Sequence, residues 1–258
     1  MKIWNTEVSA IYKWSVAIDK VYKWTNEVYT SYTWLTRAEL DALIAADADV
    51  TNVDVSSITD FSYLFKDNTT FNQNISWWDT GSAITMEQMF AGASSFNQNI
   101  NNWNVSNVTN MRFMFYNASL FNSPLWNWNV SKVQFMRYLF YGSVFNQDIS
   151  LWNISSVTET NFMLSGCPFN QNISWWNTSN ITNMEWMFYN NSSFNQDISL
   201  WNTSSATDMD DMFRSTSSFN QNISWWNVSN VISCNNFRLS SALTCPNTPA
   251  LPSACTWC

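Results

Sequence analysis

The feature that most constrains this chain is a motif that recurs about every 25 residues. A phenylalanine followed by asparagine occurs seven times, in steps of 25, 25, 24, 24, 25 and 25 residues, and a tryptophan closes each motif. The phenylalanines are Phe71, Phe96, Phe121, Phe145, Phe169, Phe194 and Phe219. Such a period predicts a solenoid, because one coil cannot bury its own apolar residues and has to stack on its neighbours.

Two kinds of spacing alternate within each repeat. Residues 96–100 are typical of a short extended segment, whereas Val108, Met111, Met114 and Phe115 have the i, i+3, i+6, i+7 spacing of a helix face. We therefore expect an α/β-type repeat solenoid, similar to leucine-rich repeats, with a short strand and a short helix in each coil.

The first 35 residues follow a different repeat. Tryptophan recurs every ten residues, at Trp4, Trp14, Trp24 and Trp34, between alternating apolar and polar residues. This pattern predicts a small antiparallel β module with one aromatic face, which four short strands cannot bury alone. We expect residues 1–35 to anchor the chain, by self-association or on a particle.

The remaining chain divides into a solenoid and a C-terminal cap. We assign residues 36–240 to the solenoid, with a cap and half coil over 36–70 and seven coils over 71–240. A helix is expected over residues 36–46. Prolines in the Pro/Cys-rich segment 241–258 would end the stacking and cover the last coil.

The composition argues against several classes of function. The chain lacks histidine, a common general base and zinc ligand. Its formal net charge of −8 disfavours contact with nucleic acid or anionic lipid. The N-terminus lacks the apolar segment of a signal peptide, and no apolar run is long enough to predict a membrane span.

The five cysteines do not form a regular framework. Cys167 and Cys234 are isolated, whereas Cys245, Cys255 and Cys258 cluster near the C-terminus. A disulfide within this cluster is the leading interpretation, and buried free thiols or a metal site are the alternatives.

Carboxylates are too dispersed to predict a catalytic or metal site. Asp148 and Asp197 occupy equivalent positions two coils apart, so their backbones would be separated by ~10 Å. Asp208, Asp210 and Asp211 form an acidic cluster without the spacing of a calcium loop, which favours a solvated face. We predict no catalytic, cofactor-binding or metal-binding residues.

Asparagines recur with two different roles. The asparagine after each phenylalanine is expected to bond to the backbone of neighbouring coils. A second set forms Asn-x-Ser/Thr sequons at one equivalent position: Asn104, Asn129, Asn153, Asn177, Asn202 and Asn227. Asp79 and Asp54 replace them in the first coil and the cap, which favours turn hydrogen bonding. N-glycosylation in a eukaryotic secretory pathway is the alternative.

Aromatic residues at variable positions form the candidate binding surface. One set precedes the closing tryptophan, and the other lies between the two methionine positions: Trp77, Trp175 and Trp225; Phe113, Tyr138, Phe162 and Trp186. If these side chains point outward, they suit sugar rings or partner proteins. If they lie between coils, they are part of the core.

The segment from Phe194 to Asn202, with residues 180–188 before it, resembles the 25-residue repeat of BspA-like bacterial surface proteins. The resemblance covers residues 50–240 and implies a right-handed solenoid for adhesion or display, without catalytic residues to transfer. Two coils depart from it, one at residues 123–126 and one at Thr160 and Leu164. More weakly, residues 1–34 resemble Trp-rich repeats of phage structural proteins.

We therefore expect a non-enzymatic protein at a virion or extracellular surface, with a protein or carbohydrate of a cell surface as its partner. The leading function is a phage or virus fibre, receptor-binding or decoration protein. The alternative is a secreted adhesin or filament subunit, carrying N-glycans or not. A polysaccharide-active enzyme is a remote third alternative.

Overall fold

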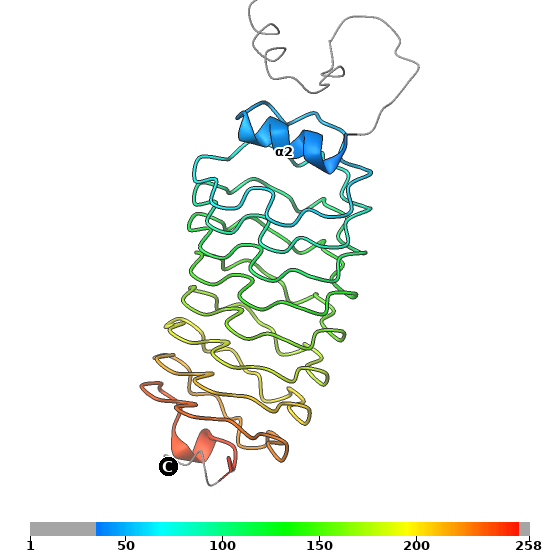
Figure 1. Cartoon of the computed structure of the whole chain (residues 1–258). Coiled ribbons are helices and arrows are strands. Elements are labelled where there is room, and N and C mark those ends of the chain that lie inside the picture. Colours follow the sequence, from blue (N-terminus) through cyan, green and yellow to red (C-terminus); the bar gives the residue numbers. More distant parts are fainter. Residues whose placement is uncertain (1–34, 253–258) are drawn as a thin grey trace, which may run out of the picture.

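The computed structural model describes residues 35–252, which form a column of stacked coils (Figure 1). One α-helix, α2 (Arg37–Ala45), covers the first coil, and a short 3-10 helix, η1 (Cys245–Asn247), lies at the other end. The expected helix over 36–46 is therefore present as α2. The predicted β module falls almost wholly outside the described residues. No helix within residues 35–252 could span a lipid bilayer.

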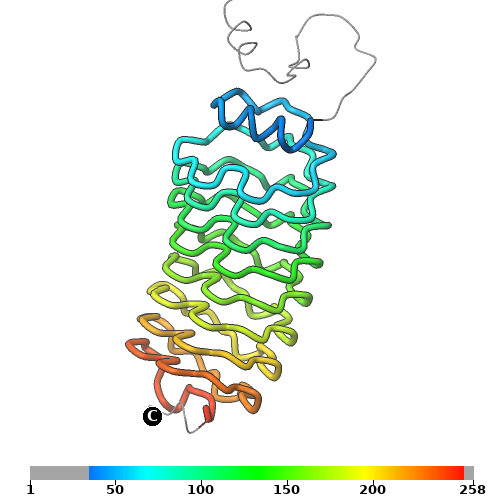
Figure 2. The backbone as a smooth tube through the Cα atoms, in the orientation of Figure 1, coloured from blue at the N-terminus to red at the C-terminus, as the bar shows by residue number. Residues whose placement is uncertain are grey.

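A single row of isolated parallel bridges runs along the column and fixes its register. Each bridge joins one residue to the residue 24 or 25 positions later, so every coil lies directly on the previous one (Figure 2). The row consists of Asp60, Thr85, Asn110, Phe135, Glu159, Asn183, Asp208 and Ser233. Each coil meets the next at one such bridge, and no named strand occurs in residues 35–252.

The predicted α/β class is therefore wrong. Within residues 71–240 the chain has no helix, and the coils consist of consecutive turns. Residues 96–100 form no named strand, and Asn97 N donates to the side-chain oxygen Oδ1 of Asn72, 3.0 Å away. Side-chain amides thus take the place of a strand ladder in this segment.

The expected helix is replaced by a ladder of turns. Phe113 N donates to Arg137 O of the next coil at 2.9 Å, whereas Met114 N donates to Met111 O within its own coil at 3.2 Å. Phe113 has a left-handed φ of 58°, which ends any α-helical path. Buried methionines three apart result from these i to i+3 turns, so the helix-like spacing had a different cause.

The left-handed conformation recurs in every coil, three residues after the bridge. These residues have φ between 52° and 65°: Tyr63, Gln88, Phe113, Tyr138, Phe162, Trp186, Asp211 and Asn236. Bulky L-residues rarely adopt this region, at a cost of ~1–3 kcal/mol each. Stacking between coils has to offset that cost.

Buried aromatic columns fill the interior of the stack. Neighbouring rings of the repeated phenylalanines lie near parallel, as in Phe71–Phe96 and Phe96–Phe121, both with centroids 5.9 Å apart. Every closing tryptophan donates its indole N–H to a carbonyl of the preceding coil; Trp176 Nε1 lies 3.2 Å from Ile149 O. This satisfies the polar group of a buried ring.

The predicted asparagine ladder is confirmed. In each coil the asparagine after phenylalanine accepts, through Oδ1, the backbone N–H of the equivalent residue in the next coil. Asn170 Oδ1 also accepts from Gln196 Nε2, at 2.9 Å. The FNQN motif is thus a register element between coils.

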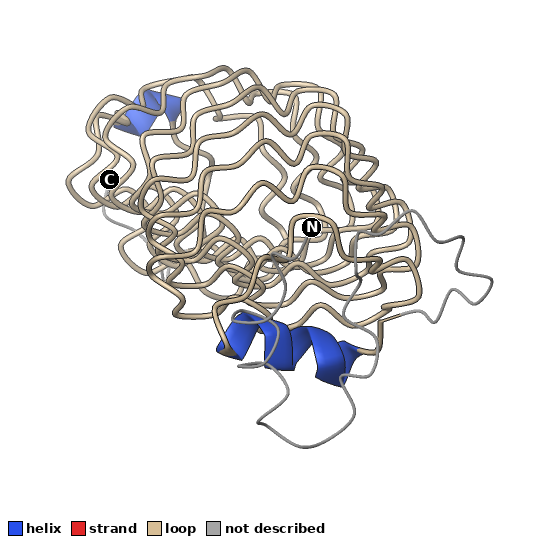
Figure 3. Ribbon diagram, turned by 90° about the horizontal axis from the view of Figure 1, so that it is seen from above, coloured by secondary structure: helices blue, strands red, loops and turns tan. Residues whose placement is uncertain are grey.

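Both ends of the column are closed. Arg37 of α2 donates through Nη1 and Nη2 to Asp60 O and Ser62 O, both at 2.6 Å, in place of a preceding coil's N–H groups. At the other end, Thr244 N donates to Asn220 Oδ1, and Asn247 Nδ2 donates to Asn220 O. Seen from above, the coils overlie one another around a common interior (Figure 3).

Candidate functional site

An unbroken row of exposed apolar side chains follows four consecutive coils. This apolar ridge consists of Leu151, Trp175, Leu200 and Trp225, which are 83%, 80%, 68% and 85% exposed. All four precede a closing tryptophan in the chain. The ridge combines two of the predicted tryptophans with two leucines that belong to the same row.

A hydrogen-bonded turn directs Trp175 of the ridge outward. Asn172 Oδ1 accepts Ser174 N at 2.9 Å, and Trp176 N donates to Ile173 O at 3.2 Å. The i to i+3 bond turns the chain sharply, so that Trp175 lies outside while Trp176 is only 3% exposed. The third predicted tryptophan, Trp77, is 83% exposed, but Asn102 and Asn127 separate it from the ridge.

The other predicted aromatic residues form a stack of their own. Phe113–Tyr138, Tyr138–Phe162 and Phe162–Trp186 have ring centroids 4.7, 4.2 and 5.4 Å apart and interplanar angles below 10°. All four side chains are partly exposed. Because the rings cover one another's faces, the two inner rings have no face free to stack on a sugar.

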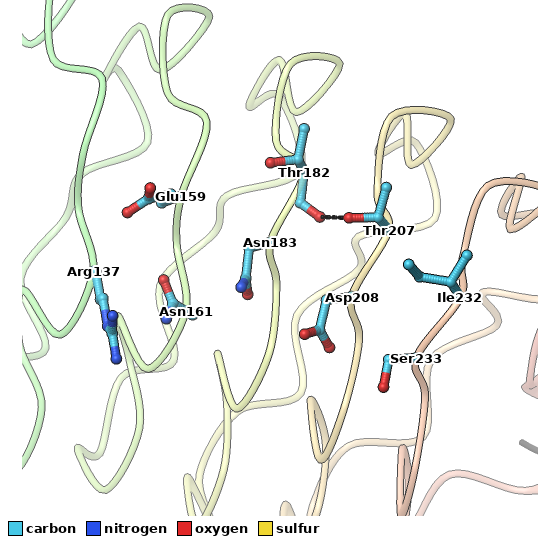
Figure 4. A pocket seen from close by; sticks show the side chains of 9 residues that line it. All are labelled: Arg137, Glu159, Asn161, Thr182, Asn183, Thr207, Asp208, Ile232 and Ser233. Carbon is cyan, nitrogen blue, oxygen red and sulfur yellow. Dashed lines mark hydrogen bonds between the residues drawn. The ribbon is translucent and has the colours of Figure 1, made fainter.

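A polar groove of about 390 Å³ runs along the bridge row (Figure 4). It is lined by Arg137, Glu159, Asn161, Thr182, Asn183, Thr207, Asp208, Ile232 and Ser233. Thr207 donates its hydroxyl to Thr182 O at 3.1 Å, so these threonines stabilise the wall. The remaining charged and amide side chains define the chemistry of the groove.

Charge is distributed unevenly along the groove. Glu159 is neutralised by Arg112, with Nη2 and Oε2 2.8 Å apart. Burial, followed by repulsion from Asp210, raises the pKa of Asp208. Burial likewise raises the pKa of Glu185, and repulsion from Asp208 adds to it. The groove is therefore acidic at the end near Asp208.

This arrangement divides the predicted acidic cluster. Asp211 is 5% exposed and pairs with Arg214 at 3.2 Å, whereas Asp208 lines the groove. Within residues 35–252, no group of three or more Asp, Glu, His or Cys side chains is arranged to hold a metal ion. No ion-binding role follows for these aspartates.

Asn161 is an unusual member of the groove wall. It is 3% exposed, and its Oδ1 has no hydrogen-bond partner among the described residues. Ser165 Oγ, in the same coil, is the other buried side-chain oxygen or nitrogen without a partner in residues 35–252. No sequence pattern singled out Asn161, although the departure from the repeat at Thr160 and Leu164 marked this coil.

Asp148 and Asp197, which occupy equivalent positions two coils apart, each stabilise a local turn. Asp148 Oδ1 accepts Ser150 N, and Asp197 Oδ1 accepts Ser199 N, at 2.8 and 2.9 Å. Hydrogen bonds from Ser199 lower the pKa of Asp197, which is the opposite of what a general acid needs.

The sequon asparagines have the predicted turn bonds. Each accepts, through Oδ1, the backbone N–H two residues later; for Asn177 the distance to Ser179 N is 3.2 Å. All six residues of the equivalent set are exposed: Asn104, Asn129, Asn153, Asn177, Asn202 and Asn227. Turn chemistry is thus confirmed, and glycosylation stays a prediction.

The cysteines have different environments. Cys167 is a buried free thiol whose pKa burial raises to about 12, so it is unreactive at neutral pH. Cys234 is disulfide-bonded, which the spacing did not predict. Cys255 and Cys258 lie outside the described residues, so the predicted disulfide among Cys245, Cys255 and Cys258 stays a prediction.

Comparison with known proteins identifies a family. The family described as "Mycoplasma protein of unknown function, DUF285" matches residues 38–150 and 140–245, which overlap and together span most of the chain. No curated protein and no solved structure matches the chain significantly. The same family model matches the chain twice in succession, which agrees with a chain built from repeated coils. This chain therefore belongs to the DUF285 family, which carries no assigned function.

Proposed function

We propose that this chain is a non-enzymatic, surface-displayed binding protein, and that its apolar ridge contacts the target. In this proposal its repeats are of the BspA-like type, and the particle is a phage or virus that uses the chain as a fibre, receptor-binding or decoration protein. The observation that carries the proposal is the ridge itself. Four consecutive coils each present a large apolar side chain that is 68–85% exposed.

The ridge has the composition of a binding surface. Apolar contact stabilises association by about 25 cal/mol per Å² removed from water, and tryptophan is enriched among residues that dominate binding energy. Single exposed apolar residues are ordinary, but a contiguous row is not. The ridge side chains are largely exposed to solvent, which suits contact with a protein or carbohydrate of a cell surface.

Two further observations support the rest of the proposal. The tryptophan repeat of residues 1–34 supplies an aromatic segment for particle anchoring or self-association. The lowered pKa of Asp197 argues against acid catalysis by this carboxylate. Both favour display and binding over hydrolysis.

The test compares tryptophans at the same turn position. Labelled full-length protein is sedimented with intact bacterial cells and with insoluble chitin and cellulose. Exchange of Trp175 and Trp225 for alanine should lower binding at least tenfold at an unchanged melting temperature. Trp77→Ala removes an equally exposed ring outside the ridge and is the matched control. Equal binding by the native chain and the double variant would contradict the proposal.

A second function, a secreted N-glycosylated adhesin or filament subunit, is favoured by the six exposed sequon asparagines. Intact mass of the native protein distinguishes the two, because glycans add discrete increments. Imaging of the native assembly then shows whether the chain decorates particles or cells.

A further inference from the structure

We propose that the polar groove binds a short zwitterionic peptide, with the peptide carboxylate at Arg137 and its ammonium group at Asp208. The groove uses none of the ridge residues, so this site is separate from the proposed adhesion surface. Four features carry the proposal: the charge at Arg137, the charge at Asp208, the amides between them and the separation of these two residues.

The basic end is held in place by aromatic rings. The Arg137 guanidinium carbon lies 5.1 Å from the ring centroid of Tyr138 and 6.0 Å from that of Phe113. Among residues 35–252, no ion pair joins Arg137 to a carboxylate. A guanidinium fixed over aromatic rings and open to the groove suits bidentate binding of a carboxylate.

The acidic end carries charge that the fold neutralises only in part, because burial and repulsion raise the pKa of Glu185 more than attraction from Arg137 lowers it. In the described part of the chain, the four ion pairs leave out Asp208, Glu185 and Asp210. Burial, and after it repulsion within this group, raises the pKa of Asp208 and of Glu185. An ammonium group placed at Asp208 would relieve the repulsion.

The middle of the groove offers amide chemistry. Asn161 is almost fully buried in the groove wall, and its Oδ1 has no partner in residues 35–252. Asn183 lies beside it, with its Oδ1 accepting Glu185 N at 2.9 Å (Figure 4). A buried amide left unpaired is costly, and a peptide backbone supplies both the donors and the acceptors it needs.

The separation of the coils that carry Arg137 and Asp208 sets the length of the peptide. Phe135, Glu159, Asn183 and Asp208 are consecutive bridge residues, so the coils of Arg137 and Asp208 are three steps apart. Three steps of ~4.8 Å give ~14 Å between these backbones. Two charged contacts of ~2.8 Å leave ~9 Å. An extended chain covers ~3.3–3.6 Å per residue, which corresponds to three residues.

The charge pattern separates this ligand from two others. A divalent cation would lie near the Arg137 charge, and no cluster of three carboxylates within residues 35–252 is arranged to hold it. A neutral sugar would leave the charged ends of the groove without counter-ions. Only a ligand with opposite charges at its two ends can pair with both Arg137 and Asp208.

The experiment uses the full chain and a length series. Isothermal titration at low salt is performed with glycine, diglycine, triglycine and tetraglycine. We expect the tightest binding for triglycine and at least tenfold weaker binding for glycine. N-acetyl-triglycine amide, which has the same backbone without the end charges, should not bind.

Two single variants test which residue binds each charged end of the peptide. Arg137→Gln and Asp208→Asn should each weaken triglycine binding at least tenfold. The amide introduced by Asp208→Asn retains an oxygen for the turn bond that Asp208 Oδ1 accepts from Asp210 N, so the local fold should persist. Glu87→Gln changes a carboxylate outside the groove and should leave binding unchanged.

Any of the following results would overturn the proposal: no triglycine binding at millimolar concentration, equal affinity across the length series, or equal binding of the capped peptide. Preferential binding of methyl glucoside would also overturn it in favour of a sugar site. Loss of cell binding in the ridge variants with triglycine binding intact would separate this site from the proposed adhesion function.

Discussion

Two adjacent tryptophans, Trp175 and Trp176, have opposite roles. Trp176 is 3% exposed and donates its indole N–H to Ile149 O of the preceding coil. Trp175 is 80% exposed and lies on the ridge. The same contrast holds for Trp225 and Trp226, 85% and 4% exposed. Position in the turn, and not residue type, separates a stacking element from a contact surface.

In this fold, inward residues stabilise the stack and outward residues are available for contact with a partner. The inner columns hold the coils together, whereas outward positions are free to vary without loss of the stack. Asn102 and Asn127 occupy the row of Trp175 in two coils, and Leu151 and Leu200 in two others. Function can therefore change along the outer row while the inner column stays constant.

The largest expected effect is at the inner tryptophan. Trp176→Ala should lower the free energy of unfolding by about 3–5 kcal/mol, because it removes a buried ring and one of the two hydrogen bonds that the Ile149 carbonyl accepts. Chemical denaturation of native and variant chains measures this difference. A loss below about 1 kcal/mol would show that the inner column does not hold the coils together.

The next effect extends the comparison to asparagine. Asn170→Ala should cost about 1–3 kcal/mol, since Asn195 N and Gln196 Nε2 both lose their acceptor. Asn177→Ala removes only a bond within one exposed turn, to Ser179 N, and should cost about 0.5–1 kcal/mol. Parallel denaturation of both variants gives the ranking, and equal losses would contradict it.

A smaller effect concerns the carboxylates of the groove. Glu185 and Asp208 have raised pKa values, so the folded chain binds their protons more tightly than the unfolded chain does. Stability therefore falls as pH rises above their ordinary values of 4.5 and 3.8. The double variant Glu185→Gln, Asp208→Asn should be more stable than the native chain at pH 7, by under about 1 kcal/mol.

The control for this prediction is pH itself. The advantage of the double variant should vanish below pH 3.8, where both native carboxyls are protonated. Thermal unfolding from pH 3 to 8 provides the measurement. Asp197, whose pKa is lowered, contributes in the opposite sense, with stability lost as pH falls below 3.8.

The smallest effect should come from the outer tryptophan. Trp175→Ala is expected to change the free energy of unfolding by less than about 0.5 kcal/mol, because the ring is 80% exposed. Its melting temperature should match that of the native chain within error. A large loss would mean that the ridge belongs to the core and would remove it as a contact surface.

Sequence pattern alone predicted much of the organisation. Recurrence of Phe, Asn and Trp predicted stacked coils in register, because a residue that packs on its own equivalent has to repeat with the coil. The ladder role of Asn170 and the turn role of Asn177 followed in the same way. These residues interact with equivalents one coil away or with the next two residues, so spacing in the chain reports spacing in the structure.

Other features depended on contacts that spacing cannot report. Met111 and Met114 suggested a helix, because a turn ladder and a helix both bury residues three apart. Only the left-handed φ of Phe113 and its bond to Arg137 O distinguish the two. The helix prediction failed for this reason.

The sequence by itself determined the period, the register and the residues that stack, since these depend on repetition. The tertiary structure alone decided which side of each turn faces water and where the stacked coils leave an open groove. Arg137 and Asn161 lie two residues after consecutive bridge positions and Asp208 lies on the bridge row itself, so the period aligns them, but only the folded column shows that they line one groove. Their proximity depends on the placement of successive coils, which becomes defined only when the column forms.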